Sequence, residues 1–145
     1  MRLTSVLHAL NPLRSVPEVD AHCDLMCGVY NPAQARIEAE SVHEIAKKYQ
    51  DSDDEVFRAR CIQIKENRAE LAKHHIWVLW TDYFKPPHLE EYPQLHQLVW
   101  EATKAAGDAK KTMDPKAGEE LLAKIDELAD IFWATKGGKP DWMTK

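Results

Sequence analysis

One imidazole and two thiols lie within six residues of one another near the start of the chain, at His22, Cys23 and Cys27. Thiolate and imidazole groups at this spacing can surround a single ion, and sulfur ligands favour zinc or a late transition metal. The third cysteine, Cys61, lies far along the chain, so the odd cysteine count argues against a disulfide framework. The sequence therefore indicates a metal-binding hook over residues 22–30.

Two other features resemble metal ligands, but a structural interpretation is favoured for each. Glu40 and His43 form a Glu-x-x-His pair, the unit used by carboxylate-bridged di-iron bundles. Such sites need a second pair, and the sequence has none, so we expect a solvated helix face. Cys61 falls within a helical apolar pattern, where a buried free thiol is the simpler interpretation.

The composition is that of one soluble globular domain, with 145 residues, 44% of them hydrophobic and 30% charged. The formal net charge of −5 argues against nucleic acids and anionic membranes as partners. No apolar run approaches the roughly 20 residues that a membrane span requires. Because the thiols are expected to be free and no convincing secretory signal is found, we expect a cytoplasmic location.

Residues 1–21 differ from the rest of the chain because they contain Pro12 and Pro17 and show no sustained helical period. Their apolar stretch is too short for the core of a secretory signal, and Arg14 interrupts that pattern further. Pattern alone leaves two interpretations open, a disordered N-terminus or a removable pro-segment.

From residue 31 onward the sequence predicts helices almost throughout. Asparagine, aspartate and proline stand at the expected helix starts, where they are favoured as caps and first residues. The expected helices are 31–49, 51–80, 93–107 and 114–136, followed by a frayed tail at 137–145. Gly107 is expected to end the third helix, and Pro86 and Pro87 to interrupt the chain before it. Short connections between these helices predict an all-α, antiparallel four-helix bundle over residues 31–136.

The second helix carries residues at alternating spacings of four and three, which is the pattern of a buried seam. The seam consists of Phe57, Cys61, Ile64, Arg68, Leu71, His75 and Val78. Arg68 interrupts the apolar series, and a buried guanidinium requires a carboxylate partner.

The chain is also rich in tryptophan, and four of its five tryptophans lie on different faces of three predicted helices. These are Trp77, Trp80, Trp100 and Trp133. One bundle cannot bury all of these rings, so we expect neighbouring subunits to cover some of them.

The segment from His22 to Ser41, HCDLMCGVYNPAQARIEAES, closely resembles the start of the mature nickel-containing superoxide dismutases. The resemblance continues through the second helix, through WTDYFKP at residues 80–86 and to IFW at residues 131–133. It therefore covers most of residues 22–135. Two positions depart from the family pattern: Met26 replaces the usual proline, and Asn31 replaces the usual aspartate.

The resemblance implies an enzyme that converts superoxide to dioxygen and hydrogen peroxide while a nickel ion alternates between Ni(II) and Ni(III). It implies a homohexamer of four-helix bundles. It also implies a leader that a dedicated peptidase removes, which would place the cut between Ala21 and His22. The pro-segment interpretation of residues 1–21 is then the favoured one.

The resemblance further implies which residues form the site. The nickel ligands would be the α-amino group and imidazole of His22, the amide nitrogen and thiolate of Cys23, and the thiolate of Cys27. Six more residues match positions of the family's site, namely Asp24, Tyr30, Glu38, Arg68, Tyr83 and Lys85. The aspartate would fix the hook and the glutamate–arginine pair would orient the imidazole. The two tyrosines would line the substrate pocket, and the lysine would attract the small anion.

Two alternative functions follow from the residues without the resemblance. The bundle could bind nickel, copper or zinc at the hook for storage or sensing, without turnover. It could also be a structural oligomer whose hook is degenerate, an interpretation that Met26 allows.

Overall fold

The computed structural model describes residues 28–140. The predicted ligands His22, Cys23 and Cys27, together with Asp24, Met26 and the segment 1–21, lie outside these residues. The same holds for residues 141–145 of the predicted tail.

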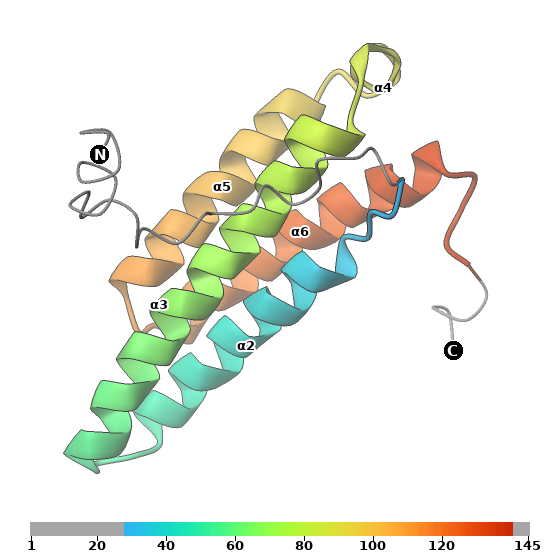
Figure 1. The fold of residues 1–145 in the computed structure, drawn as a ribbon. Helices are drawn as coiled ribbons and strands as arrows, with labels where there is room; N and C mark the ends of the chain where they lie inside the picture. The colour runs from blue at the N-terminus through green and yellow to red at the C-terminus, as the bar shows by residue number, and fades with distance from the viewer. Residues whose placement is uncertain (1–27, 141–145) are drawn as a thin grey trace, which may run out of the picture.

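Four long helices lie side by side and run in alternating directions along the chain (Figure 1). They are α2 (Ala33–Gln50), α3 (Glu55–Val78), α5 (Leu95–Lys111) and α6 (Pro115–Thr135). Contacts join α2 to α3, α3 to α5, α5 to α6 and α6 to α2, so each long helix packs against two neighbours. Residues 28–140 contain no strand. The predicted antiparallel four-helix bundle is confirmed.

The helix starts follow the local sequence. The Asn31 side chain accepts a hydrogen bond from the Ala33 N–H at 2.8 Å. Asp54 caps α3 through the Phe57 N–H at 2.9 Å, and Asp114 caps α6 through the Lys116 N–H at 3.0 Å. Short acceptor side chains satisfy backbone donors that have no partner within the helix. Asn31 thus serves as a cap, as expected for a residue that replaces aspartate.

The predicted seam of α3 is wrong in its larger part. Phe57, Ile64 and Leu71 remain 40%, 41% and 37% exposed. The buried side of α3 instead consists of Cys61, Lys65, Ala69, Ala72, Ile76 and Val78. Cys61 is a buried free thiol, as predicted.

This difference arises because α3 has two stripes of apolar side chains, and the stripe with the smaller side chains is the one that is buried in the bundle. The buried residues of α2 are Ala35, Ala39, Val42 and Ala46. Alanines on both helices permit a close approach of the two backbones, and dense packing is favoured in a protein interior. The stripe with larger side chains is therefore left on the outside.

The connection between α3 and α5 contains more helix than predicted. The chain continues from α3 as a π-helix, η2 (Leu79–Tyr83), closed by the Phe84 N–H on the Leu79 carbonyl at 3.0 Å. A short helix, α4 (Pro86–Glu91), then begins at the two prolines. Proline has no backbone N–H, but the N–H groups of the first helical turn have no partner within the helix. Pro86 and Pro87 can therefore begin α4 without loss of a helical hydrogen bond.

Gly107 does not end the third long helix, which continues to Lys111. The end of α5 is held by Lys65, whose side chain is 1% exposed. Its ammonium donates to the carbonyls of Ala109 at 2.7 Å, Lys110 at 2.9 Å and Thr112 at 2.6 Å. Burial lowers the pKa of Lys65. A buried lysine on α3 thus supplies donors to carbonyls at the end of α5.

Replacing Lys65 by methionine is expected to lower the free energy of unfolding by about 2–4 kcal/mol, because three carbonyls lose charged donors while the side-chain volume is kept. Thermal or urea unfolding followed by circular dichroism measures this. Lys110→Met is the matched control, because Lys110 forms an exposed ion pair with Glu70. We expect a much smaller change there. Equal losses in the two variants would contradict the assigned role of Lys65.

Among residues 28–140, no helix has the length and apolar character that a membrane span requires.

Candidate metal centre and substrate pocket

A pocket of about 380 Å³ lies at the end of the bundle where the described chain begins. Its lining residues are Gly28, Tyr30, Asp82, Tyr83, Lys85 and His88. They come from the segment before α2, from η2, and from α4 with the residue that caps it, which meet at one end of the bundle (Figure 1). Gly28 has a φ of +73°, a conformation that favours glycine, and it directly follows Cys27. The pocket therefore begins where the predicted hook joins the bundle.

Three of the predicted site residues, Tyr30, Tyr83 and Lys85, line this pocket together. The ring centroids of Tyr30 and Tyr83 are 5.7 Å apart, with the planes tilted by 55°. Lys85 follows the π-helix in an extended conformation and precedes the first turn of α4. Tyr30 and Tyr83 are 53 positions apart in the sequence. They form one wall of the pocket because the end of η2 places Tyr83 beside the segment that precedes α2.

Two further residues support Tyr83, and the sequence pattern predicted no role for either. His88 stacks on the Tyr83 ring with the centroids 5.5 Å apart, and its Nδ1 accepts the Lys85 backbone N–H at 3.2 Å. Thr135, at the end of α6, lies with its Oγ1 2.6 Å from the Tyr83 hydroxyl. For His88, the sequence gives one local indication of this contact: a side chain at the third helical position can reach back to the capping residue, here Lys85. Nothing local indicates Thr135.

Glu38 and Arg68 are in contact, as the resemblance implied. Arg68 on α3 donates to both carboxylate oxygens of Glu38 on α2, at 3.1 and 3.3 Å. The expectation of a buried guanidinium is wrong, because the Arg68 side chain is 41% exposed while that of Glu38 is 15% exposed. The arginine lies on the outer stripe of α3 and reaches inward to a carboxylate that is more buried than itself. Neither residue lines the pocket.

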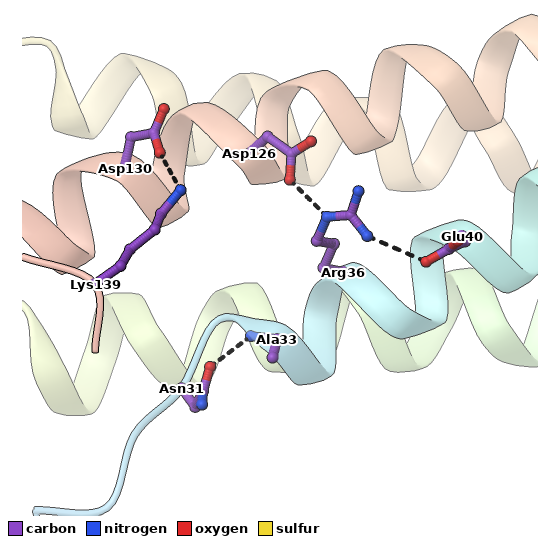
Figure 2. Close-up of polar contacts among 7 residues, drawn as sticks. All are labelled: Asn31, Ala33, Arg36, Glu40, Asp126, Asp130 and Lys139. Carbon is purple, nitrogen blue, oxygen red and sulfur yellow. Dashed lines mark hydrogen bonds and ion pairs between the residues drawn. The ribbon is translucent and has the colours of Figure 1, made fainter. Parts of the chain in front are cut away.

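The first turns of α2, which follow the hook, are fixed to α6 by charged side chains (Figure 2). Arg36 donates to Asp126 on α6 at 2.9 Å and to Glu40 at 3.1 Å. Beyond α6, Lys139 donates to Asp130 at 2.9 Å. Arg36, Asp126, Asp130 and Lys139 border a cavity of about 560 Å³, and their opposite charges are paired across it. They position the start of α2 and, with it, the point from which the hook extends.

Within residues 28–140, no cluster of three or more histidine, cysteine, aspartate or glutamate side chains is arranged to hold a metal ion. Glu40 is paired with Arg36, and the His43 ring contacts the Pro115 carbonyl through Nδ1 at 3.1 Å. Glu40 therefore lies on an exposed helix face, as expected, whereas the His43 side chain is only 16% exposed and contacts the start of α6. The donors of the predicted hook, two thiolates and a histidine, are of the sulfur and nitrogen type that suits a late transition metal.

Comparison with known proteins identifies the family. Residues 17–136 match the family model of the nickel-containing superoxide dismutases. The protein named superoxide dismutase [Ni] of Streptomyces coelicolor is 58% identical over 118 residues, which cover 81% of this chain and 90% of the relative. The protein of the same name from Streptomyces seoulensis is 60% identical over 119 residues, covering 82% of this chain and 91% of that one.

Solved structures give the same result for the fold. The native nickel superoxide dismutase structure at 1.30 Å aligns with a TM-score of 0.79 and 57% sequence identity. The alignment covers 81% of this chain and the whole of that chain. A structure whose nickel ligation corresponds to the oxidised state aligns with a TM-score of 0.78 and 59% identity, again over 81% of this chain.

The bundle, the pocket and these matches define a metal-dependent oxidoreductase built on a four-helix scaffold. The chain belongs to the nickel-containing superoxide dismutase family. Its cofactor is nickel and its substrate is superoxide, as the resemblance implied. A storage or sensing bundle without turnover is not favoured.

Proposed function

We propose that this chain converts superoxide to dioxygen and hydrogen peroxide at a nickel ion held by His22, Cys23 and Cys27. The observation that carries the proposal is the position of the pocket. It begins at Gly28, the residue after the last proposed ligand, and Tyr30, Tyr83 and Lys85 line it. Substrate in this pocket would lie beside the hook.

Nickel, when bound, supplies the one-electron couple that the two half-reactions need. The chain's part is to supply ligands that make this couple accessible. Thiolates from Cys23 and Cys27 and the deprotonated amide nitrogen of Cys23 are strong anionic donors, and donors of this kind stabilise the higher oxidation state. The amine and imidazole of His22 complete the proposed set, and Asp24 is proposed to fix the conformation of the hook.

Substrate selection is proposed to depend on Tyr30, Tyr83 and Lys85. The chain carries a net charge of −5, so an anion is repelled over most of its surface. Lys85 at the pocket gives a local positive approach within about one Debye length. The Tyr30 and Tyr83 rings, whose centroids are 5.7 Å apart, are proposed to narrow the pocket that they line. Small anions are admitted in this proposal, and larger ones are excluded.

Glu38 and Arg68 are proposed to orient the His22 imidazole. The pair bridges α2 and α3, and its carboxylate is the more buried partner, which suits a group that must hold a second side chain in place. A guanidinium that is partly open to water still has donors in excess of the two that bind Glu38.

Replacing Glu38 by glutamine or Arg68 by alanine is expected to lower dismutase activity about 10–100-fold while nickel remains bound, because the outer partner of a metal ligand is lost. Pulse radiolysis measures the activity, and metal analysis of the same sample measures the nickel. Glu40→Gln is the matched control, since Glu40 forms an exposed pair with Arg36 on the same helix. Unchanged activity in both test variants would show that the Glu38–Arg68 pair only joins α2 to α3 and has no role in orienting His22.

We also propose that the protein forms a homohexamer. Support comes from α3, whose outer stripe of Phe57, Ile64 and Leu71 is incompletely covered within one chain. Trp100 on α5 is 56% exposed, and Trp77 on α3 is exposed as well. Large apolar side chains gathered on one helix face are typical of surfaces that another subunit covers. Trp133, in contrast, is buried within the bundle, so only part of the tryptophan set needs a neighbour.

Residues 1–21 are proposed to be a pro-segment that a dedicated peptidase removes in the cytoplasm. The family match begins at residue 17, so most of this segment lies outside the part that the family shares. The described residues 28–140 already contain a continuous hydrophobic core, which supports a bundle that folds as a unit.

One purified sample tests the proposed function. Nickel content, the N-terminal residue and superoxide turnover are measured together on the processed protein. We expect nickel to be bound, the chain to begin at His22, and superoxide to be removed catalytically. Bound nickel without turnover would instead identify a storage or sensing protein, and absence of nickel would indicate a degenerate hook.

A further inference from the structure

A chain of two hydrogen bonds determines the direction in which the Tyr83 hydroxyl points its proton. The Thr135 hydroxyl donates to the Phe132 carbonyl at 2.7 Å. The Tyr83 hydroxyl lies 2.6 Å from the same Thr135 oxygen. Thr135 has a single hydroxyl proton, and a carbonyl only accepts. With that proton on Phe132, the bond between the two hydroxyls requires Tyr83 to be the donor.

The Tyr83 ring is held on several sides, so its hydroxyl oxygen stays in place. Phe132 lies against it with the centroids 4.4 Å apart, and His88 stacks on it at 5.5 Å. The Lys136 ammonium lies 5.3 Å from the ring centroid. Aromatic and cation–π contacts of this kind fix the plane of a ring. The phenol therefore stays beside the end of α6.

We propose that Thr135 is a positioning residue: its hydroxyl oxygen accepts the hydrogen bond from Tyr83 and so directs the phenol proton toward the end of α6. In the pocket, the Tyr83 hydroxyl can then act only as a hydrogen-bond acceptor, so it does not donate to an anion there. The inference rests on the proposed function for the identity of the site's substrate, but not for the direction of the hydrogen bond.

This assignment has a chemical consequence for the pocket. A phenol that donates to an anion would help to hold it, and this would apply to competing anions such as azide or halides as well as to the substrate. A phenol whose proton is already bound elsewhere offers only lone pairs, which favour neutral partners with protons over anions. Tyr83 would then narrow the pocket without retaining small anions, and Thr135 would be the residue that prevents such retention.

Thr135→Val tests the proposal, because valine keeps the shape of threonine and cannot accept the phenol proton. Azide is the probe, applied to the processed, nickel-loaded protein during superoxide turnover. We expect Thr135→Val to tighten azide inhibition about three- to tenfold, the effect of one added hydrogen bond. Thr135→Ser, which keeps the hydroxyl, should behave as the wild type. Adding Tyr83→Phe to Thr135→Val should abolish the gain.

A role confined to packing would predict the opposite pattern. Loss of a structural contact at the end of α6 would weaken azide inhibition or leave it unchanged, and serine would not restore it. Either result overturns the proposal. Helix content by circular dichroism, measured on the same samples, shows that each variant is folded.

A second measurement needs no activity. Ultraviolet resonance Raman spectra of the metal-free protein report whether tyrosine hydroxyls donate or accept hydrogen bonds. Thr135→Val should shift the signal of one donating tyrosine, because the freed phenol donates to water in place of the threonine oxygen, whereas Thr135→Ser should retain the wild-type spectrum. An unchanged spectrum in Thr135→Val overturns the inference. A changed spectrum in protein without dismutase activity would uphold the hydrogen bond while the proposed function fails.

Discussion

Replacing Cys23 or Cys27 by serine is expected to reduce superoxide turnover by more than about 100-fold. Loss even of an outer partner of a metal ligand costs about 10–100-fold, and here the ligand itself is removed. Serine keeps the shape of cysteine, but its hydroxyl is a poor donor for a late transition metal. The variants are compared with the wild type by nickel analysis and by pulse radiolysis.

The helical circular dichroism signal should remain nearly unchanged in both variants. Within residues 28–140, the side chains that form the core of the bundle come from α2 to α6. Loss of activity would then reflect loss of the site, not loss of the fold.

Cys61→Ser provides the matched control because it makes the same substitution at the buried free thiol of α3. We expect this variant to bind nickel and retain activity, with only a modest loss of stability from a buried hydroxyl. Retained activity in either hook variant would show that residues 22–30 do not form the catalytic site.

The second large effect concerns the N-terminus. Protein that still carries residues 1–21 is expected to show no turnover above background, and removal of the segment after Ala21 is expected to restore full activity. In the unprocessed chain the nitrogen of His22 is part of an amide, whose lone pair is delocalised and which is therefore a far poorer donor than an amine. Intact-mass measurement establishes the N-terminus of each sample before the activity assay.

A chain that begins at Ala21 separates the two effects of the segment. It adds a single small residue, so little bulk is introduced, but the His22 nitrogen remains an amide. If the amine is the required ligand, this chain should be as inactive as the full-length one. Full activity in it would indicate that the segment acts only by occupying space. Full activity in the complete chain would contradict the pro-segment proposal altogether.

The sequence by itself determined those features that depend on neighbours along the chain. The proposed ligands His22, Cys23 and Cys27 lie within six residues, so covalent connection alone brings them together. The caps at Asn31, Asp54 and Asp114 likewise act on donors only two or three residues away. Helix periodicity and short connections were enough to predict the antiparallel bundle.

The tertiary structure decided which of two apolar stripes on α3 is buried. Spacing could not distinguish them, because the choice depends on the volumes that the facing helix presents. The alanines of α2 accept the stripe that contains Ala69 and Ala72, and the predicted seam of Phe57, Ile64 and Leu71 is left outside.

The support of the pocket was also decided only in three dimensions. Tyr83 and Thr135 are separated by 52 residues, and no local pattern connects a tyrosine after α3 with a threonine at the end of α6. Lys65 and its three carbonyls are separated by 44–47 residues in the same way. Hydrogen bonds over such separations form only when helix packing has fixed both partners, because the packing face of each helix sets the direction of its side chains.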